Sequence, residues 1–304
     1  MTQRHAIERV LVPTDGSEGA LSGARRGIDL ARAATAELHV LSVVDTRETG
    51  VLRTRFDEEG EEPQALLEAD AEAAVEAVVD VADRTDATLD VTTAVERGAP
   101  HETIAEYASA HDIDVVAMGT KGRAGLERVL LGSVTERVLR TVDMPVLAVP
   151  PGSDSLAPDG QPYENILLPT DGSEGAAVAV DWGISLADSF DAMVHTLFSV
   201  DTSRIPATST PSDVLTDLEQ TGEQALDEVR TRATDAGVSV TGLVASGPPT
   251  RVIMQYVDDN DIDLVAMGTH GRSGLPRHVL GSVAENVVRN ADVPVFCVPM
   301  VDDA

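Results

Sequence analysis

The sequence predicts an α/β fold: two domains, each a doubly wound, Rossmann-like parallel sheet of five strands with helices on both faces. Three observations lead to this fold class. Motifs recur at offsets of 149 and 156 residues, apolar strand-like runs alternate with helical patterns in each half, and those runs are continuous in apolar residues. Strand–helix alternation favours a parallel sheet with right-handed crossovers. Continuous apolar runs are typical of strands that are covered on both faces.

The elements of the first half follow one another in a regular order. In the first expected helix, Leu21, Ala24 and Ile28 recur at helical spacing. The second half repeats the same order from residue 165 to residue 298. The expected strands of the first half are Arg9–Pro13, 37–44, 87–96, 113–118 and 145–149, and the expected helices are Glu18–Ala34, 63–84, 100–111 and 134–142.

Two motifs carry the duplication, and each follows an expected strand. A repeat of this length is one whole domain rather than a solenoid unit. The stretch between the halves is rich in turn-forming residues, so we expect domains at 1–150 and 164–304 and a linker at 151–163. The motifs are Pro13-Thr-Asp-Gly-Ser17, repeated as Pro169-Thr-Asp-Gly-Ser173, and Gly119-Thr-Lys-Gly122, nine residues and Gly132-Ser133, repeated as Gly268-Thr-His-Gly271, nine residues and Gly281-Ser282.

The glycine motif has the chemistry of an anion-binding turn. A glycine-dense turn between a buried strand and a helix start lets backbone N–H groups point at phosphate. We expect Gly119 and Gly122 to permit both positive φ and a close approach of the backbone to phosphate. Ser133 is the expected N-cap of the next helix. Lys121 lies within this turn, where its ammonium would help to neutralise a triphosphate.

Each of these residues also has a simpler structural interpretation. Asp15 and Asp171 follow a strand and could cap the next helix through an Asx-turn. The glycines could serve only to make a tight turn. Met118 and Met267 could be core residues at strand ends, and His270 could be a solvated loop residue. Three glycines at one spacing before a serine, in both halves, favour the phosphate-binding interpretation.

These motifs resemble those of the universal stress protein family, and the resemblance covers nearly all of both halves. It implies a tandem protein with strand order 3-2-1-4-5 in each domain, membership of the ATP-binding subclass, and dimerisation through the last strand. The implied adenine-nucleotide contacts in the first copy are Pro13, Thr14, Asp15, Val43, Met118, Gly119, Lys121, Gly122, Gly125, Gly132, Ser133, Val134 and Thr135. In the second copy they are Pro169, Thr170, Asp171, Ser199, Met267, Gly268, His270, Gly271, Gly274, Gly281, Ser282 and Val283.

The two implied sites are not identical. Lys121 is replaced by His270, Val43 by Ser199, Glu127 by Pro276, and the hydroxyl of Thr135 is lost at Ala284. These four departures predict that the second site binds differently or more weakly.

Composition limits the partners of the chain. The net charge is −30, and Lys121 is the only lysine. Such a surface repels nucleic-acid phosphates and anionic lipid, so we expect neither nucleic acid nor membrane as a partner. The acidic, lysine-poor balance resembles that of cytosolic proteins of halophiles that accumulate salt; an ordinary acidic protein is the alternative.

The cellular compartment of the protein is predicted from features that its sequence lacks. Cys297 is the only cysteine, so no disulfide forms within the chain. The first residues show no signal segment, and no apolar run reaches the ~18 residues of a membrane span. We therefore expect a soluble, cytoplasmic protein.

Three classes of function remain open, and the sequence favours the first. They are a nucleotide-binding regulatory stress protein with one ATP site per domain, with or without Mg²⁺; a slow ATP-hydrolysing enzyme; and a scaffold whose sites are empty. No Gly-x4-Gly-Lys-Ser/Thr loop or catalytic constellation is present, which argues against a dedicated ATPase. Asp15 would at most carry a metal or position water. We also expect the two domains to form an internal pseudo-dimer, with further homo-oligomers left open.

Overall fold

The computed structural model describes residues 5–46, 63–122, 131–153, 162–201, 211–271 and 280–300. The chain divides into two compact units. One is Ala6–Asp154, and the other is Ser155–Ala304 together with Met1–His5. Each unit is an α/β domain, so the predicted fold class is confirmed, and each is described on its own.

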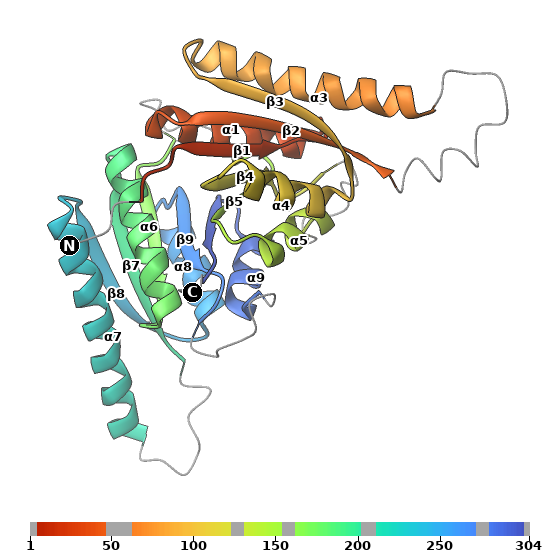
Figure 1. Cartoon of the computed structure of the whole chain (residues 1–304). Helices are drawn as coiled ribbons and strands as arrows, with labels where there is room; N and C mark the ends of the chain where they lie inside the picture. Colours follow the sequence, from red (N-terminus) through yellow and green to blue (C-terminus); the bar gives the residue numbers. More distant parts are fainter. Residues whose placement is uncertain are drawn as a thin grey trace. The chain divides into compact units, whose positions relative to one another are not determined.

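The first domain is a parallel sheet in the order β3-β2-β1-β4-β5, as predicted. Helices α1 and α3 pack on one face of this sheet, and α4 and α5 pack on the other (Figure 1). β1 and β4 are buried along most of their length, because both faces are covered. The elements are β1 (Arg9–Pro13), α1 (Glu18–Ala34), β2 (Glu37–Asp45), α3 (Pro63–Thr85), β3 (Val91–Gly98), α4 (Pro100–Ala110), β4 (Val115–Gly119), α5 (Ser133–Thr141) and β5 (Val146–Val149).

The second domain has the same topology, with its strands in the order β8-β7-β6-β9-β10. Helices α6 and α7 cover one face, and α8 and α9 cover the other. The first described residue, His5, belongs to this unit and stacks on Trp182 with ring centroids 4.2 Å apart. The elements are β6 (Asn165–Thr170), α6 (Glu174–Phe190), β7 (Met193–Val200), α7 (Pro211–Asp235), β8 (Val240–Ser246), α8 (Pro249–Asp259), β9 (Leu264–Gly268), α9 (Ser282–Asn290) and β10 (Val295–Val298).

The predicted start of the third strand, at residue 87, is wrong. β3 begins at Val91, because residues 86–90 form a turn that Asp86 closes. Its Oδ1 accepts hydrogen bonds from the Thr88 N–H at 2.9 Å and from the Thr88 hydroxyl at 2.7 Å. Asp and Asn close turns of this kind on their own backbone, and this local bond competes with strand pairing.

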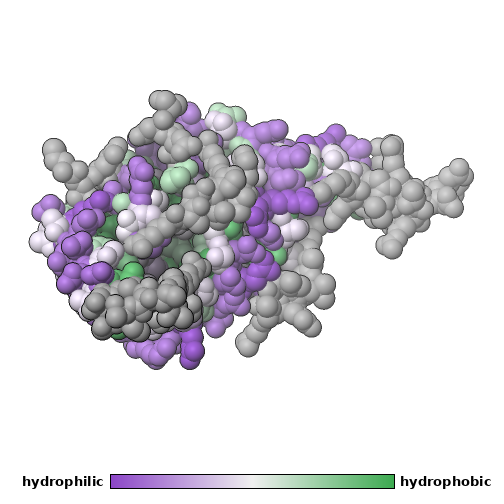
Figure 2. All heavy atoms as spheres, turned by 90° about the horizontal axis from the view of Figure 1, so that it is seen from below, coloured by the Kyte–Doolittle hydropathy of each residue, from purple (hydrophilic) through white to green (hydrophobic). Residues whose placement is uncertain are grey.

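Hydrophilic side chains cover most of the coloured surface on the face drawn in Figure 2. This agrees with 52 acidic and 22 basic residues in the chain. Among the described residues, no helix is long and apolar enough to cross a membrane.

Candidate functional site

The sheet order places a ligand-binding crevice at the carboxyl ends of β1 and β4. These strands pair in parallel through Val10 with Val115 and Leu11 with Val116, and the connections turn in opposite directions on either side of them. Ligands of open α/β sheets bind at such a topological switch point. In the second domain the equivalent pair is β6 and β9.

The turn after β1 is fixed by its own side chains. Thr14 Oγ1 accepts a hydrogen bond from the Gly16 N–H at 3.2 Å, and Asp15 Oδ1 accepts one from the Ser17 N–H at 3.0 Å. Gly16 has φ 77°, a conformation that favours glycine. Ser17 then caps α1 by accepting a hydrogen bond from the Ala20 N–H. The Asx-turn interpretation of Asp15 is therefore correct, and it holds one carboxylate oxygen in place.

The same turn is built in the second domain. Thr170 Oγ1 accepts from the Gly172 N–H at 3.1 Å, and Asp171 Oδ1 accepts from the Ser173 N–H at 3.0 Å. Gly172 has φ 74°. The duplication therefore preserves the geometry of the turn as well as its sequence.

The glycine turn after β4 is tied to the start of α5. The Gly132 N–H donates to the Thr120 carbonyl at 2.7 Å, and the Thr135 hydroxyl donates to the Gly119 carbonyl at 2.8 Å. Glu136 is the first residue of α5 whose N–H bonds within the helix, to the Gly132 carbonyl. The three preceding N–H groups of a helix have no intrahelical acceptor and suit an anion. They belong to Ser133, Val134 and Thr135.

Two details of the predicted glycine turn are corrected by the structure. Neither Gly119 nor Gly122 has positive φ, so that part of the prediction is wrong; each is instead closely approached by other parts of the protein, and the approach to phosphate stays a prediction. A Cβ on Gly119 would lie 2.0 Å from the Gly19 carbonyl oxygen. The N-cap of α5 is Gly132 rather than Ser133, because Ser133 already has helical geometry as the first residue of the helix. Its hydroxyl is therefore not a cap.

A second set of glycines, in α1, was not predicted from the sequence. A Cβ on Gly19 would lie 2.1 Å from the Lys121 carbonyl oxygen, and one on Gly23 would lie 2.4 Å from the Gly119 nitrogen. These residues allow α1 to lie directly against the glycine turn. A signal was present in the sequence, since Gly19, Gly23 and Gly27 are spaced by four and so share one helical face.

Asp15 and Gly122 lie next to each other across the crevice. A Cβ on Gly122 would be 2.7 Å from Asp15 Oδ2, and a Cβ on Gly271 would be 2.8 Å from Asp171 Oδ2. Each domain therefore brings the turn after its first strand into contact with the turn after its fourth strand. Glycine is the residue that leaves room for this approach.

The second site differs from the first in three described positions. His270, which replaces Lys121, is buried, and its Nδ1 lies 2.9 Å from the Thr269 hydroxyl. The interpretation of His270 as a solvated residue is therefore wrong. Ser199, which replaces Val43, donates its hydroxyl to the Gly247 carbonyl at 2.7 Å. Ala284 has no hydroxyl to make the bond that Thr135 makes to the turn.

The remaining predicted residues fall into three groups. Pro13 is the last residue of β1, and Pro169 is the residue before the last in β6. Val43 lies two residues beyond Leu41, whose carbonyl accepts a hydrogen bond from the Thr14 N–H. Met118 and Met267 are each 6% exposed, as expected of core residues at strand ends. Gly125, Gly274, Glu127 and Pro276 lie outside the described residues.

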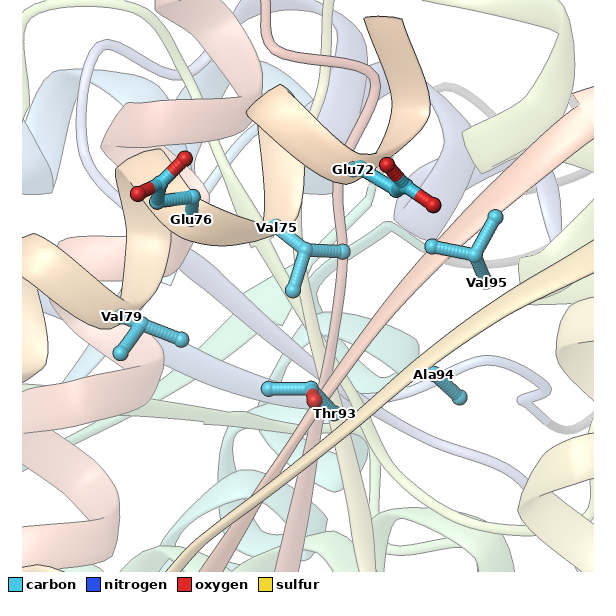
Figure 3. Close-up of a pocket in the computed structure, with 7 residues that line it drawn as sticks. All are labelled: Glu72, Val75, Glu76, Val79, Thr93, Ala94 and Val95. Atoms are coloured by element: carbon cyan, nitrogen blue, oxygen red, sulfur yellow. The ribbon is translucent and has the colours of Figure 1, made fainter. Parts of the chain in front are cut away.

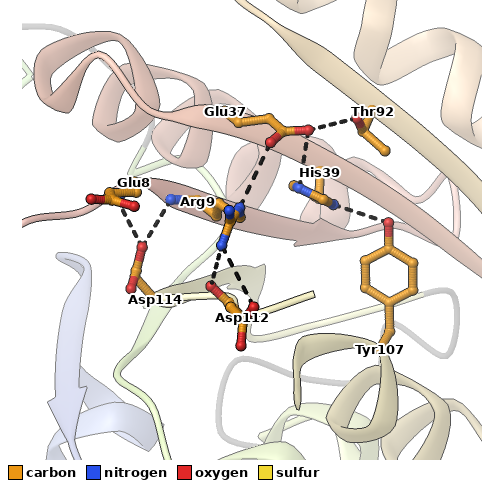
Figure 4. Close-up of polar contacts among 8 residues, drawn as sticks. All are labelled: Glu8, Arg9, Glu37, His39, Thr92, Tyr107, Asp112 and Asp114. Carbon is orange, nitrogen blue, oxygen red and sulfur yellow. Dashed lines mark hydrogen bonds and ion pairs between the residues drawn. The ribbon is translucent and has the colours of Figure 1, made fainter. Parts of the chain in front are cut away.

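A polar cluster that the sequence analysis missed lies near the amino end of β2, away from this crevice. His39 Nδ1 lies 3.0 Å from the Tyr107 hydroxyl (Figure 4). Its Nε2 lies 3.2 Å from Glu37 Oε1, an ion-pair distance without the alignment of a hydrogen bond. Glu37 also accepts a hydrogen bond from Thr92, and His111 stacks on Tyr107.

The second domain contains a neutral version of the cluster. His195 Nδ1 lies 3.0 Å from the Tyr256 hydroxyl, and its Nε2 lies 3.2 Å from Asn165 Oδ1. Met193 stands where the first domain has Glu37. The His–Tyr pair is thus shared, and the carboxylate is particular to the first domain.

The buried histidines predict a loss of stability in acid. Burial lowers the pKa of His39, although the Glu37 carboxylate opposes this, and burial also lowers the pKa of His195. The unfolded chain therefore binds more protons below the ordinary histidine pKa of about 6.5. Their contribution to stability is complete above that pH and is lost as the pH falls through it. Urea midpoints measured at pH 7 and pH 5 should show this loss.

A substitution at His39 measures how much of this pH dependence of stability arises in the first domain. His39→Gln should make the pH dependence of the urea midpoint shallower, because one group with a lowered pKa is gone. Ser109→Ala, at an exposed position of the same helix as Tyr107, is the control and should leave the dependence as it was. Equal dependence in all three proteins would contradict the prediction.

Two doubly wound domains, each with a glycine turn at its switch point, make this a Rossmann-like α/β protein. The chain belongs to the universal stress protein family: the sequence model of that family matches residues 6–150 and again residues 162–299. The predicted family and its tandem arrangement are confirmed.

Individual relatives agree with this assignment. A universal stress protein of Methanocaldococcus jannaschii is 37% identical over 139 residues, which cover 45% of this chain and 82% of that protein. One of Mycobacterium bovis is 32% identical over 191 residues, 62% of each chain. The crystal structure of a universal stress protein from Archaeoglobus fulgidus covers 96% of this chain and 98% of its own, with a TM-score of 0.68. At 22% identity it shows the shared fold.

Proposed function

We propose that each domain binds one adenine nucleotide at its switch-point crevice, and that nucleotide occupancy makes the chain a regulatory protein of the stress response. The observation that carries this proposal is the double turn, in which Asp15 meets Gly122 and Asp171 meets Gly271 beside a helix start whose N-cap glycine supplies no side-chain cap. Two independent copies of one crevice would not be needed for turns that only reverse the chain.

The described residues suit a triphosphate chain in the first site. The N–H groups of Ser133, Val134 and Thr135 begin α5, where the helix dipole favours an anion. Lys121 adds the one lysine ammonium of the protein. The Pro13–Asp15 turn and Val43 are left to hold the adenosine side. Glycine at 122 leaves the space that a Cβ would fill.

Asp15 is the residue suited to a metal ion that accompanies the phosphates. Its Oδ1 is bound to the Ser17 N–H, and its Oδ2 faces the glycine turn beside Gly122. Mg²⁺ in nucleotide sites is commonly held by one or two carboxylates together with phosphate oxygens. Such an ion would neutralise charge between the phosphates and the carboxylate.

The second site should have the lower affinity. His270 is held by Thr269 and is buried, so it is less free than a lysine to approach a phosphate. The backbone bond that Thr135 makes to the glycine turn has no equivalent at Ala284. The turn before α9 is therefore less firmly tied.

A slow ATP hydrolase is the second candidate function, and a scaffold with empty sites is the third. Asp15, the carboxylate beside Gly122, already serves the Asx-turn, which favours binding over catalysis. Phosphate release by the pure protein above the rate of the Gly122→Val variant would support the enzyme. We also propose that the protein acts in the cytoplasm, as an internal dimer of its two domains, at high salt.

Calorimetry with ATP and Mg²⁺ in molar KCl tests the nucleotide proposal. We expect two binding events per chain, the tighter one in the first domain. At about 100 times Kd, ATP should stabilise each domain by roughly 2.7 kcal/mol, and thermal unfolding should shift upward. GTP at equal concentration is the control for base preference. Absence of both heat and thermal shift would support the empty scaffold.

A further inference from the structure

An open groove lies in the first domain between α3 and β3, apart from the nucleotide crevice. Its volume is about 400 Å³. Valine side chains from both elements line it, and the two glutamates project from α3 (Figure 3). The lining residues are Glu72, Val75, Glu76 and Val79 of α3 and Thr93, Ala94 and Val95 of β3.

The second domain fills the equivalent space with an aromatic ring. Phe198 of β7 is 3% exposed and packs with Leu215, Leu218 and Val244 between the sheet and α7. Phe198 pairs in register with Val244, and in the first domain Ser42 pairs in register with Val95. Register partners on neighbouring parallel strands lie on the same face of a sheet. The first domain therefore has a serine where the second has the ring that closes the groove.

The groove is also placed where a partner can reach it. β3 is the end strand of its sheet, with β2 as its neighbour. Val95 is 38% exposed although it is apolar. An open edge strand beside exposed apolar side chains is a surface that proteins normally cover.

The charge of the groove selects its partner. Glu72 and Glu76 lie one helical turn apart on α3, and within the described residues no ion pair joins either to a basic side chain. Arg and Lys are the complement of such a pair of carboxylates. A second copy of this chain is disfavoured, because each copy has a net charge of −30.

We propose that this groove docks a short cationic-amphipathic segment of a partner protein. Its apolar side chains would lie over Val75, Val79 and Val95, and its Arg or Lys side chains would lie against Glu72 and Glu76. In the second domain Phe198 occupies the equivalent space, so the partner would bind the first domain. The inference is independent of nucleotide binding.

A labelled peptide tests the proposal on the full chain. The probe is a 12-residue synthetic peptide with two leucines one helical turn apart and two arginines one helical turn apart. The control peptide has the same sequence with glutamate in place of each arginine. Fluorescence anisotropy should show saturable binding of the basic peptide at least about tenfold tighter than the acidic one, the difference expected from two charge-assisted contacts. Binding should weaken with KCl and persist in part, because apolar burial is not screened.

Variants of the groove residues test where on the protein the peptide binds. Val95→Gln, at an exposed position, and Ser42→Phe, which copies the second domain, should each weaken binding about tenfold or more through the lost apolar contact. Glu72→Lys with Glu76→Lys should reverse the preference between the two peptides. Leu243→Gln, at an exposed position of β8, and Asp70→Lys with Glu219→Lys, which matches the charge change, are the controls.

Each result of the peptide experiments either supports or overturns the proposed docking surface. Loss of binding in the groove variants, with binding kept in the controls, supports the docking surface. Equal loss in the matched charge control would mean attraction by net charge alone and would overturn it, as would equal binding of the acidic peptide. If Ser42→Phe fails to fold, the Val95→Gln and lysine variants decide the matter, since both change exposed side chains.

Discussion

Gly122→Val is expected to abolish nucleotide binding in the first domain and to leave the second site intact. The Cβ alone would lie 2.7 Å from Asp15 Oδ2, and valine adds two methyl groups to the same space. Asp15 cannot simply turn away, because its Oδ1 is bound to the Ser17 N–H. The crevice therefore closes. Gly271→Val should do the same in the second domain, where Asp171 stands 2.8 Å from the added Cβ.

Calorimetry with ATP would measure the number of sites in each variant. Each single variant should lose one of the two sites, and the double variant should bind none, so the two single variants are matched controls for each other. Ala110→Val, at the exposed end of α4, controls for an added valine elsewhere. Two sites of unchanged affinity in Gly122→Val would contradict the placement of phosphate at this turn.

Gly119→Ala should lower the stability of the fold, whereas Gly122→Val should abolish nucleotide binding with little loss of stability. The two variants therefore distinguish an effect on folding from an effect on binding. Its Cβ would lie 2.0 Å from the Gly19 carbonyl oxygen, a backbone atom of α1 that cannot rotate aside. The substitution should push α1 from β4 and lower the melting temperature of the protein without nucleotide. Gly122→Val meets only a side-chain oxygen and should unfold at nearly the wild-type temperature in the absence of ATP.

The sequence predicted the order and type of the elements because periodicity and turn residues act locally. It misplaced the start of β3, where Thr88 and Leu89 look strand-like but Asp86 closes a turn. The spacing of Gly119, Gly122 and Gly132 located the site. It did not reveal why glycine is needed there, because the neighbour that requires Gly119 is Gly19, a hundred residues earlier in the chain.

Other features of the site required the three-dimensional structure. His39 and Tyr107 are 68 residues apart in the sequence but form a hydrogen-bonded pair, and no local sequence pattern predicts this contact. The burial of His270 depends on how Thr269 and the end of β9 pack. The groove beside α3 is present because Ser42 stands where the second domain has Phe198. This equivalence can be recognised only once the strand registers are known.

The largest destabilisation is expected from a charge placed in the last strand of each domain. We propose that β5 and β10 pair with each other, as the family resemblance implies. Each is a short apolar strand at the end of its domain's sheet, β5 beside β4 and β10 beside β9. An open apolar edge of this kind is an aggregation hazard. The linker of 13 residues from 151 to 163 can span roughly 40 Å, at about 3.3 Å per residue, which allows such a pairing.

Leu147→Asp with Phe296→Asp should therefore separate the domains or precipitate the chain. Leu147 is 1% exposed and Phe296 is 0% exposed, so each new carboxylate would be buried without a partner, at a cost of several kcal/mol. Leu66→Asp with Leu243→Asp, at positions that are 49% and 47% exposed, is the matched control and should stay soluble.

A cut in the linker distinguishes strand pairing from a simple loss of stability. With a protease site inserted at the linker of the wild-type chain, cleavage in molar KCl should leave the two halves sedimenting together, because the pairing needs no covalent link. Domains that sediment apart after cleavage, each still folded by circular dichroism, would refute the internal dimer. The effect of the two aspartates would then be assigned to each domain's own core.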